Sequence, residues 1–359
     1  MSSVPPGSGA PRRELPEVAV ADLEVVRAVL PLRRPLVTAH GVEAERHVVL
    51  VRATASDGSV GWGECPALTS PTYTGEWADG AEAVLRRFLL PAARRGRPHG
   101  LVGHPMAAGA VEAALLQLRL AAAGASLASW LGAVRDRVPC GVAVGIADSV
   151  DELLAEVERH VAAGYRRVKL KVRPGRDVEP VRAVRAAWPD LALGVDANGS
   201  YGLADLEGSL RSLDGLGLVE LEQPLSARDL LGSAAARAAL ATPICLDESI
   251  TCADDLEVAL ALGACDHVNL KPARVGGVAA ALAVHDLALA RGVPLWVGGM
   301  LETGVGKAVA LAFAALPGAT LPGDLPGSSR WFEADLTEPF EVGPDGTMQV
   351  RDAGPVHLP

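Results

Sequence analysis

The sequence predicts an α/β fold, a (β/α)7β TIM-like barrel preceded by an α+β capping domain. After Pro139, short apolar runs alternate with segments rich in alanine and leucine up to about residue 325. Polar residues gather at the C-terminal ends of these runs, as expected of parallel strands that are buried on both faces. Eight such strands close into a barrel. The runs are CGVAVGI, RRVKLKV, LALGVDAN, LVELEQPL, TPICLDES, DHVNLKP, VPLWVGG and GATLPGD.

The part of the chain before the barrel has a different order of elements. The strand-like runs LEVVRAVLPL and RHVVLVRATA come first, and alanine-rich helical stretches follow around 81–90 and 107–123. Strands followed by helices predict a separate α+β domain. The predicted boundaries are a disordered leader at 1–14, which is rich in Pro, Gly and Ser, the capping domain at 15–138, the barrel at 139–328, and a C-terminal segment at 329–359 that returns to the capping domain.

Composition narrows the class of protein. The chain has 359 residues, of which 49% are hydrophobic and 21% charged, and this balance is typical of a soluble globular protein. No apolar stretch approaches the roughly 20 residues that span a bilayer, and the first residues lack the apolar core of a secretory signal. We therefore expect a cytoplasmic protein with no membrane partner. The net charge of -10 argues against nucleic acid, and the five scattered cysteines favour buried reduced thiols.

Five ionisable residues recur in phase with the predicted strands. They lie at the C-terminal ends of five successive runs, and 24 to 26 residues separate each from the next. This spacing is about one βα unit, so the side chains should converge on one mouth of the barrel. Three carboxylates then lie between two lysines, a set that suits Mg²⁺, or Mn²⁺ in its place, better than zinc. The five are Lys171, Asp196, Glu222, Asp247 and Lys271.

The run VKLKV places two lysines on one side of a strand. Side chains at i and i+2 share a face, so Lys169 and Lys171 should both point into the barrel mouth. Like charges at short range lower the pKa of an ammonium group, and a lysine that acts as a base near neutral pH needs such a shift. The pair therefore predicts a lysine base, with exposed lysines on an edge strand as the alternative.

The motifs around these residues resemble those of the enolase superfamily, in particular its muconate cycloisomerase-like group, which includes o-succinylbenzoate synthases and N-succinylamino acid racemases. The matching stretches are GWGECPALTSPTYTGE, VKLKV, VDANGSY, LEQPL, CLDESI, NLKPARVGG and GGMLETGVGKA. The resemblance implies that Lys171 is the base on one face of the substrate and that Lys271 is a cation or second acid/base on the other. It also implies a set of Mg²⁺ ligands, namely Asp196, Glu222 and Asp247.

The resemblance extends to loops that would contact the substrate. RPLVTAHG is similar to a mobile lid loop and PTYTGE to a second loop over the mouth, while GGMLETG would form a wall of small residues. Arg274 would either lower the pKa of Lys271, which would favour two-base racemisation, or form a structural salt bridge. A single Asp324 in place of a DxD pattern disfavours dipeptides. The implied substrate contacts are His40, Tyr73, Asn198, Arg274, Gly298, Gly299, Met300 and Glu302.

The implied reaction is the dehydration of 2-succinyl-6-hydroxy-2,4-cyclohexadiene-1-carboxylate to o-succinylbenzoate, a step of menaquinone biosynthesis. The alternatives are racemisation of N-succinylamino acids and a muconate-type cycloisomerisation. A hypothesis of another class is a catalytically silent barrel that binds an anionic metabolite, and it predicts a missing member of the metal and lysine set. No member is missing. We expect a small-molecule carboxylate as the partner and a homo-oligomeric protein.

Overall fold

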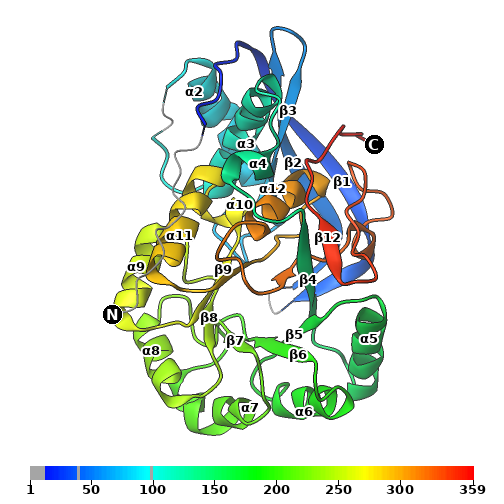
Figure 1. Ribbon diagram of the computed structural model, residues 1–359, viewed down its shortest axis with the longest axis vertical. Coiled ribbons are helices and arrows are strands. Elements are labelled where there is room, and N and C mark those ends of the chain that lie inside the picture. Colours follow the sequence, from blue (N-terminus) through cyan, green and yellow to red (C-terminus); the bar gives the residue numbers. More distant parts are fainter. Residues whose placement is uncertain (1–12, 39–40, 98–99) are drawn as a thin grey trace.

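The computed structural model describes residues 13–38, 41–97 and 100–359. Its first part is an antiparallel sheet of three strands in the order β1-β2-β3, packed against helices (Figure 1). Gly63 allows close packing here, because a Cβ atom at this position would overlap the Ala110 carbonyl of α3. The elements are β1 (Val20–Thr38), β2 (Gly41–Ala55), β3 (Val60–Cys65), α1 (Ala78–Val84), η1 (Leu85–Leu89), α2 (Leu90–Arg94), α3 (Pro105–Ala122) and α4 (Leu127–Leu131).

The second part is a nearly closed barrel of eight parallel strands, which confirms the predicted fold class. The strands follow one another in the order β10-β9-β8-β7-β6-β5-β4-β11. The two ends of this strand order are joined by a parallel β-bridge between Leu295 of β10 and Ala319, which precedes β11. Each predicted run overlaps one strand, and β4 alone begins before its run: β4 (Arg137–Val144), β5 (Arg167–Lys171), β6 (Ala192–Asp196), β7 (Glu220–Glu222), β8 (Ile244–Leu246), β9 (His267–Leu270), β10 (Leu295–Val297) and β11 (Gly323–Asp324).

Helices cover the outside of the barrel, with α5 to α9 forming an arc around β5 to β9 (Figure 1). Their apolar residues join the strand side chains in one large core, in which Val168, Val195 and Leu246 are almost fully buried. The helices are α5 (Val150–Ala162), α6 (Val178–Ala187), η2 (Leu203–Asp205), η3 (Leu206–Leu210), α7 (Arg211–Asp214), α8 (Leu230–Ala239), α9 (Ala253–Leu262), α10 (Pro272–Val275), α11 (Val278–Arg291), α12 (Gly304–Ala314) and η4 (Ser328–Arg330).

Segments near both ends of the chain connect the two parts. In the C-terminal segment, Phe332 bridges to Leu32 of β1, whereas β12 (Thr347–Gln349) pairs antiparallel with β4 of the barrel. This segment therefore contacts both the capping domain and the barrel. Most of the predicted leader lies outside the described residues, but Arg13 is described, and its carbonyl accepts a hydrogen bond of 2.9 Å from the Trp130 indole.

A half-buried glutamate of α3, Glu112, attaches the capping domain to the barrel. The Glu112 carboxylate accepts hydrogen bonds from Val278 N at 2.7 Å and Ala279 N at 2.9 Å, the first amides of α11. A negative side chain at a helix N-terminus satisfies unpaired amides and interacts favourably with the helix dipole. This contact helps to fix the position of the capping domain over the barrel.

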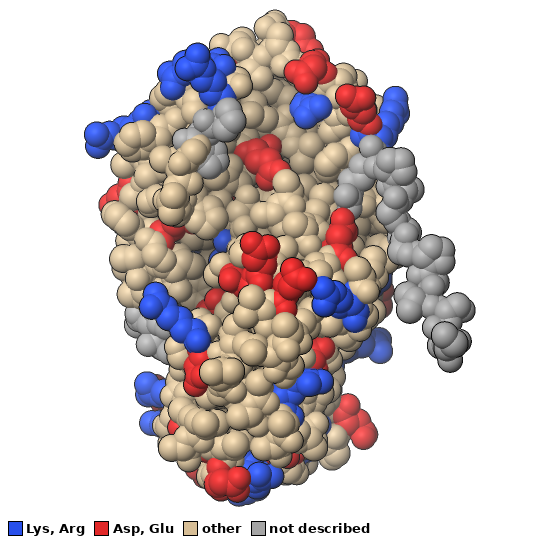
Figure 2. All heavy atoms as spheres, turned by 90° about the vertical axis from the view of Figure 1, so that its left-hand side faces the viewer, with Lys and Arg blue, Asp and Glu red and all other residues tan. Residues whose placement is uncertain are grey.

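The distribution of surface charge and the length of the helices bear on nucleic acid and membranes as possible partners. On the face drawn in Figure 2, acidic and basic side chains are interspersed rather than collected in one basic patch. Within the described ranges, no helix is both long and apolar enough to cross a membrane. All five cysteines are described and free, and four of them are buried.

Candidate active site

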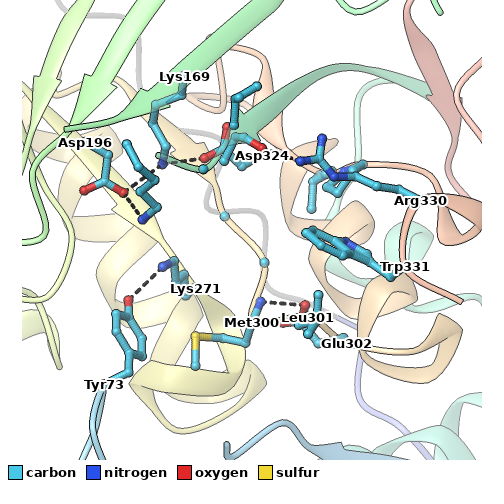
Figure 3. A pocket seen from close by; sticks show the side chains of 18 of the residues that line it. Tyr73, Lys169, Asp196, Lys271, Met300, Leu301, Glu302, Asp324, Arg330 and Trp331 are labelled. Carbon is cyan, nitrogen blue, oxygen red and sulfur yellow. Dashed lines mark hydrogen bonds and ion pairs between the residues drawn. The ribbon is translucent and has the colours of Figure 1, made fainter. Parts of the chain in front are cut away.

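The predicted site residues come together at the C-terminal ends of the barrel strands. Lys169 and Lys171 are in β5, Asp196 ends β6 and Glu222 ends β7, whereas Asp247 and Lys271 directly follow β8 and β9. A pocket opens at this mouth beneath the capping domain (Figure 3). His40 lies outside the described residues. The predicted residues that line the pocket are Tyr73, Lys169, Lys171, Asp196, Asn198, Lys271, Gly298, Gly299, Met300 and Glu302.

One side of the mouth is built around the two lysines of β5. The Lys171 ammonium donates to Asp196 Oδ2 at 2.6 Å and to Asn198 Oδ1 at 2.7 Å. Two residues earlier on the strand, Lys169 lies 3.4 Å from the same Asp196 oxygen, and its ammonium pairs also with Glu222 and with Asp324 at 2.5 Å. The two side chains therefore share one side of the strand and one carboxylate.

The prediction that the neighbouring lysine lowers the pKa of Lys169 is wrong. Burial disfavours its ammonium form, but Asp324, Glu222 and Asp196 outweigh this effect and hold the pKa of Lys169 well above its ordinary value. Three carboxylates surround a buried amine, whereas the expectation considered only its neighbouring lysine. This arrangement of carboxylates therefore favours the charged form of Lys169.

The opposite side of the mouth is built around Lys271. Its ammonium donates to Asp247 Oδ2 at 2.8 Å and to the Tyr73 hydroxyl at 2.7 Å. Arg274 pairs with the other Asp247 oxygen and donates to the Tyr73 hydroxyl at 2.9 Å. Arg274 was predicted either to lower the pKa of Lys271 or to form a structural salt bridge, and the structure contains the salt bridge, with Asp247. Burial disfavours the charged form of Lys271, but Asp247 and Tyr73 raise its pKa above the ordinary value despite the nearby guanidinium.

Barrel geometry places Lys171 and Lys271 across the mouth from each other. Their strands, β5 and β9, are separated by β6, β7 and β8 in the sheet order. Two strands that are four positions apart in an eight-stranded barrel lie on opposite sides of it. A small molecule in the pocket would thus have one lysine on each face, with the carboxylates of the intervening strands beside it.

The three carboxylates of β6, β7 and β8 have the donor chemistry of a divalent-cation site. Asp196, Glu222 and Asp247 are almost fully buried oxygen donors on adjacent strands. Beside them, the buried Glu248 Oε2 atom has no hydrogen-bond partner among the described residues. Excess buried negative charge of this kind fits a hard cation. In the described part of the chain, no group of three acidic, His or Cys side chains is arranged to hold an ion. The carboxylates of Asp196, Glu222 and Asp247 each pair with lysine or arginine instead.

Several residues in and around the mouth were not predicted from the sequence. Asn269 donates to Glu222 Oε1 at 2.8 Å, and its position in β9, two residues before Lys271, is a signal that could have identified it. The Trp296 ring lies 4.8 Å from the Lys169 ammonium. Lys307 and Arg330 also line the pocket, but no spacing in the sequence connects them with the other site residues.

Glu64 of the capping domain supports the wall of the pocket. Its carboxylate accepts hydrogen bonds from Thr303 N and Oγ1 and from Gly306 N, at the start of α12. Directly before Thr303, Glu302 lines the pocket and accepts a 2.6 Å hydrogen bond from Met300 N. Glu302, predicted as a substrate contact, thus belongs to a turn that Glu64 holds from the other domain.

Glu64 should make stability depend on pH. Burial raises its pKa from 4.5 to about 7. Between these values the folded protein keeps a proton that the unfolded chain loses, so the free energy of unfolding falls as pH rises, by about 3 kcal/mol in total. We expect urea denaturation at pH 5 and pH 7 to show most of this loss, about 2 kcal/mol, and Glu64→Gln to flatten it. An unchanged pH dependence in the variant would contradict the assignment.

Together, the fold and the mouth define a barrel enzyme with ionisable side chains on two sides of one pocket. Residues 152–355 match the family described as enolase C-terminal domain-like. An N-succinylamino acid racemase of Amycolatopsis is 47% identical over 332 residues, which cover 89% of this chain and 90% of the relative. An o-succinylbenzoate synthase of Geobacillus kaustophilus is 41% identical over 334 residues, which cover 90% of this chain and 89% of the relative.

A solved structure supports the same grouping. Muconate lactonizing enzyme from Pseudomonas fluorescens, complexed with muconolactone, matches with a TM-score of 0.87 at 29% identity, covering 95% of this chain and 97% of that one. The chain belongs to the enolase superfamily. It is an enzyme of that superfamily, and its structural neighbours are muconate cycloisomerase-like.

Proposed function

We propose that this enzyme is an o-succinylbenzoate synthase, which dehydrates 2-succinyl-6-hydroxy-2,4-cyclohexadiene-1-carboxylate in menaquinone biosynthesis. The main structural support is the placement of Lys171 and Lys271 on opposite sides of one pocket, with buried carboxylates on the strands between them. The relatives that bear this name, such as the Geobacillus kaustophilus enzyme, support the substrate assignment. The proposed partner is this small carboxylate, and the proposed location is the cytoplasm.

In this proposal Lys171 moves the proton. Its free amine removes the hydrogen from the carbon beside the substrate carboxylate, and the resulting ammonium protonates the departing hydroxyl on the same face. One C–H and one C–O bond break, a C=C bond forms, and water leaves. Asp196 and Asn198 position the Lys171 nitrogen, and the Lys271 ammonium stabilises the negative charge that develops on the carboxylate from the other face.

The proposed cofactor is Mg²⁺, with Mn²⁺ as a substitute, bound by Asp196, Glu222 and Asp247. A divalent cation supplies Lewis-acid stabilisation of the enediolate that forms when a carboxylate loses its α-proton. The ion would take over charge compensation that lysines and Arg274 provide to these carboxylates in the described structure. We expect EDTA to abolish turnover and added Mg²⁺ to restore it. Full activity in the presence of EDTA would contradict the proposal.

Racemisation of N-succinylamino acids is the second candidate. It is favoured by the 47% identity to the Amycolatopsis racemase and by the presence of a lysine on each face of the pocket. Racemisation requires one lysine to remove the proton and the other to return it on the opposite face, whereas the dehydration uses Lys171 for both transfers. We therefore expect Lys271→Met to reduce racemisation more strongly than dehydration, measured as kcat for both reactions on one preparation.

Parallel assays test the two activities. The purified protein with Mg²⁺ is given the cyclohexadiene carboxylate, followed by absorbance, and an N-succinylamino acid, followed by polarimetry. Fast dehydration with slow racemisation supports the synthase, and the reverse result supports the racemase. The absence of both reactions would refute the proposed function.

A further inference from the structure

Lysine is confined to the pocket in this chain. Of the 33 basic residues, only four are lysines, and the rest are arginines. All four lysines line the pocket at the barrel mouth. Three of them, Lys169, Lys171 and Lys271, belong to the reacting end described above. The fourth, Lys307 in α12, has no part in the proposed chemistry.

Lys307 differs from the other three lysines in its charge partners. Each of the others has a carboxylate oxygen within 3 Å of its ammonium nitrogen. Lys307 forms no ion pair with any described residue, and its ammonium donates to the Pro326 carbonyl at 2.5 Å. The residue is only 5% exposed. An ammonium has three donors, so the observed contact leaves capacity for an acceptor from outside the chain.

The charges near Lys307 only partly stabilise its ammonium. Burial lowers the pKa of this lysine, and the more distant Glu302 and Asp335 offset that effect only in part. A buried cation without a paired anion is unfavourable, because burial removes water and no opposite charge compensates for the lost solvation. A carboxylate bound beside Lys307 would supply the missing partner.

The segment that Lys307 contacts forms a distinct wall of the pocket. Leu325 and Pro326 provide its apolar surface, and Arg330 and Trp331 complete it. The Arg330 guanidinium lies 4.8 Å from the Trp331 ring, and Figure 3 shows both residues across the pocket from Tyr73 and Lys271. This wall thus combines positive charge with apolar surface, away from the Tyr73 and Lys271 side of the reacting end.

We propose that Lys307 forms a subsite for a second carboxylate of the substrate, so that the pocket selects dicarboxylates whose second acid group is separated from the reacting one by an apolar linker. This inference rests on the proposed function, since it assigns the reacting carboxylate to the end with Lys171 and Lys271. Lys307 is then a binding and specificity residue, and the wall with Arg330 and Trp331 accommodates the linker.

Binding of two matched ligands tests the subsite without turnover. The probes are o-succinylbenzoate and 2-butanoylbenzoate, which keeps the chain length but ends in a methyl group, titrated by calorimetry in the presence of Mg²⁺. In the native protein we expect o-succinylbenzoate to bind about tenfold to a hundredfold more tightly, the range for a hydrogen bond to a charged group. Lys307→Met should remove most of this preference, Lys307→Arg should keep it, and the exposed control Arg291→Met should leave it unchanged.

The outcomes separate the subsite from the reaction. The native protein could prefer o-succinylbenzoate, lose this preference in Lys307→Met, and yet turn over neither the cyclohexadiene carboxylate nor an N-succinylamino acid. This result would uphold the subsite and refute the proposed function. The subsite would be overturned if the native protein bound both probes with equal affinity or bound neither. A folded Lys307→Met variant that keeps the full preference would overturn it as well. In an active enzyme, the same variant should lower the ratio of kcat/KM for N-succinyl over N-acetyl amino acids by a similar factor.

Discussion

Replacing Lys171 with alanine is expected to lower both dehydration and racemisation by about a thousandfold or more, because general acid–base catalysis contributes about 10²–10⁴-fold and Lys171 takes part in both proposed reactions. The effect should appear in kcat rather than KM, since the lost group acts on the transferred proton. Lys171 is partly exposed, with 24% of its side chain accessible, so its removal should leave the fold intact. Steady-state kinetics on both substrates measure the loss.

The matched control for this experiment is Lys171→Arg. A guanidinium keeps the positive charge beside Asp196 but does not lose a proton under these conditions, so it cannot act as the base. We expect it to be nearly as inactive as the alanine variant. Circular dichroism and thermal unfolding establish that both variants fold. If Lys171→Arg retained most of the activity, Lys171 would serve as a cation and the base would be another residue.

The largest expected loss of stability concerns Glu220, which lies deeper in the barrel than the reacting groups. Its carboxylate is completely buried, pairs with the Arg167 guanidinium and accepts a 2.9 Å hydrogen bond from the Trp296 indole. Removing one partner leaves the other charge buried without compensation. We expect Glu220→Gln to lower the free energy of unfolding by about 3 kcal/mol, with Asp324 at 3.1 Å from Arg167 limiting the damage.

Urea denaturation of the variant and of an exposed control measures this effect. Glu257 pairs with Arg291 on the surface at 2.9 Å, and surface ion pairs contribute little because water screens them. Glu257→Gln should therefore unfold at nearly the native urea concentration. An equally small change in Glu220→Gln would show that the buried pair does not stabilise the barrel.

The fold and the position of the site were predictable because both depend on periodic features of the chain. Parallel strands buried on two faces require continuous apolar runs, and eight of them were visible. A repeat of 24 to 26 residues matches one βα unit, so residues in phase with it emerge at one end of the barrel. The closing strand β11 has only two residues, Gly323 and Asp324.

The partners of each charged group were not predictable, because they belong to segments far apart in the sequence. Lys169 pairs with Asp324 since β11 lies next to β4, which lies next to β5. The expectation of a lowered pKa for Lys169 failed for this reason. Likewise, Lys307 stands outside the repeat, and only the structure places it in the pocket, where no carboxylate of the described residues pairs with it.

The sequence by itself determined the barrel, the capping domain and the mouth at which lysines and carboxylates meet, because hydrophobic periodicity and spacing along the chain specify backbone topology. Only the tertiary structure decided which lysine is surrounded by carboxylates, which arginine forms a buried salt bridge and which lysine from outside the repeat lines the pocket. Electrostatic energies depend on distance and burial in three dimensions, and neither quantity can be obtained from the order of residues alone.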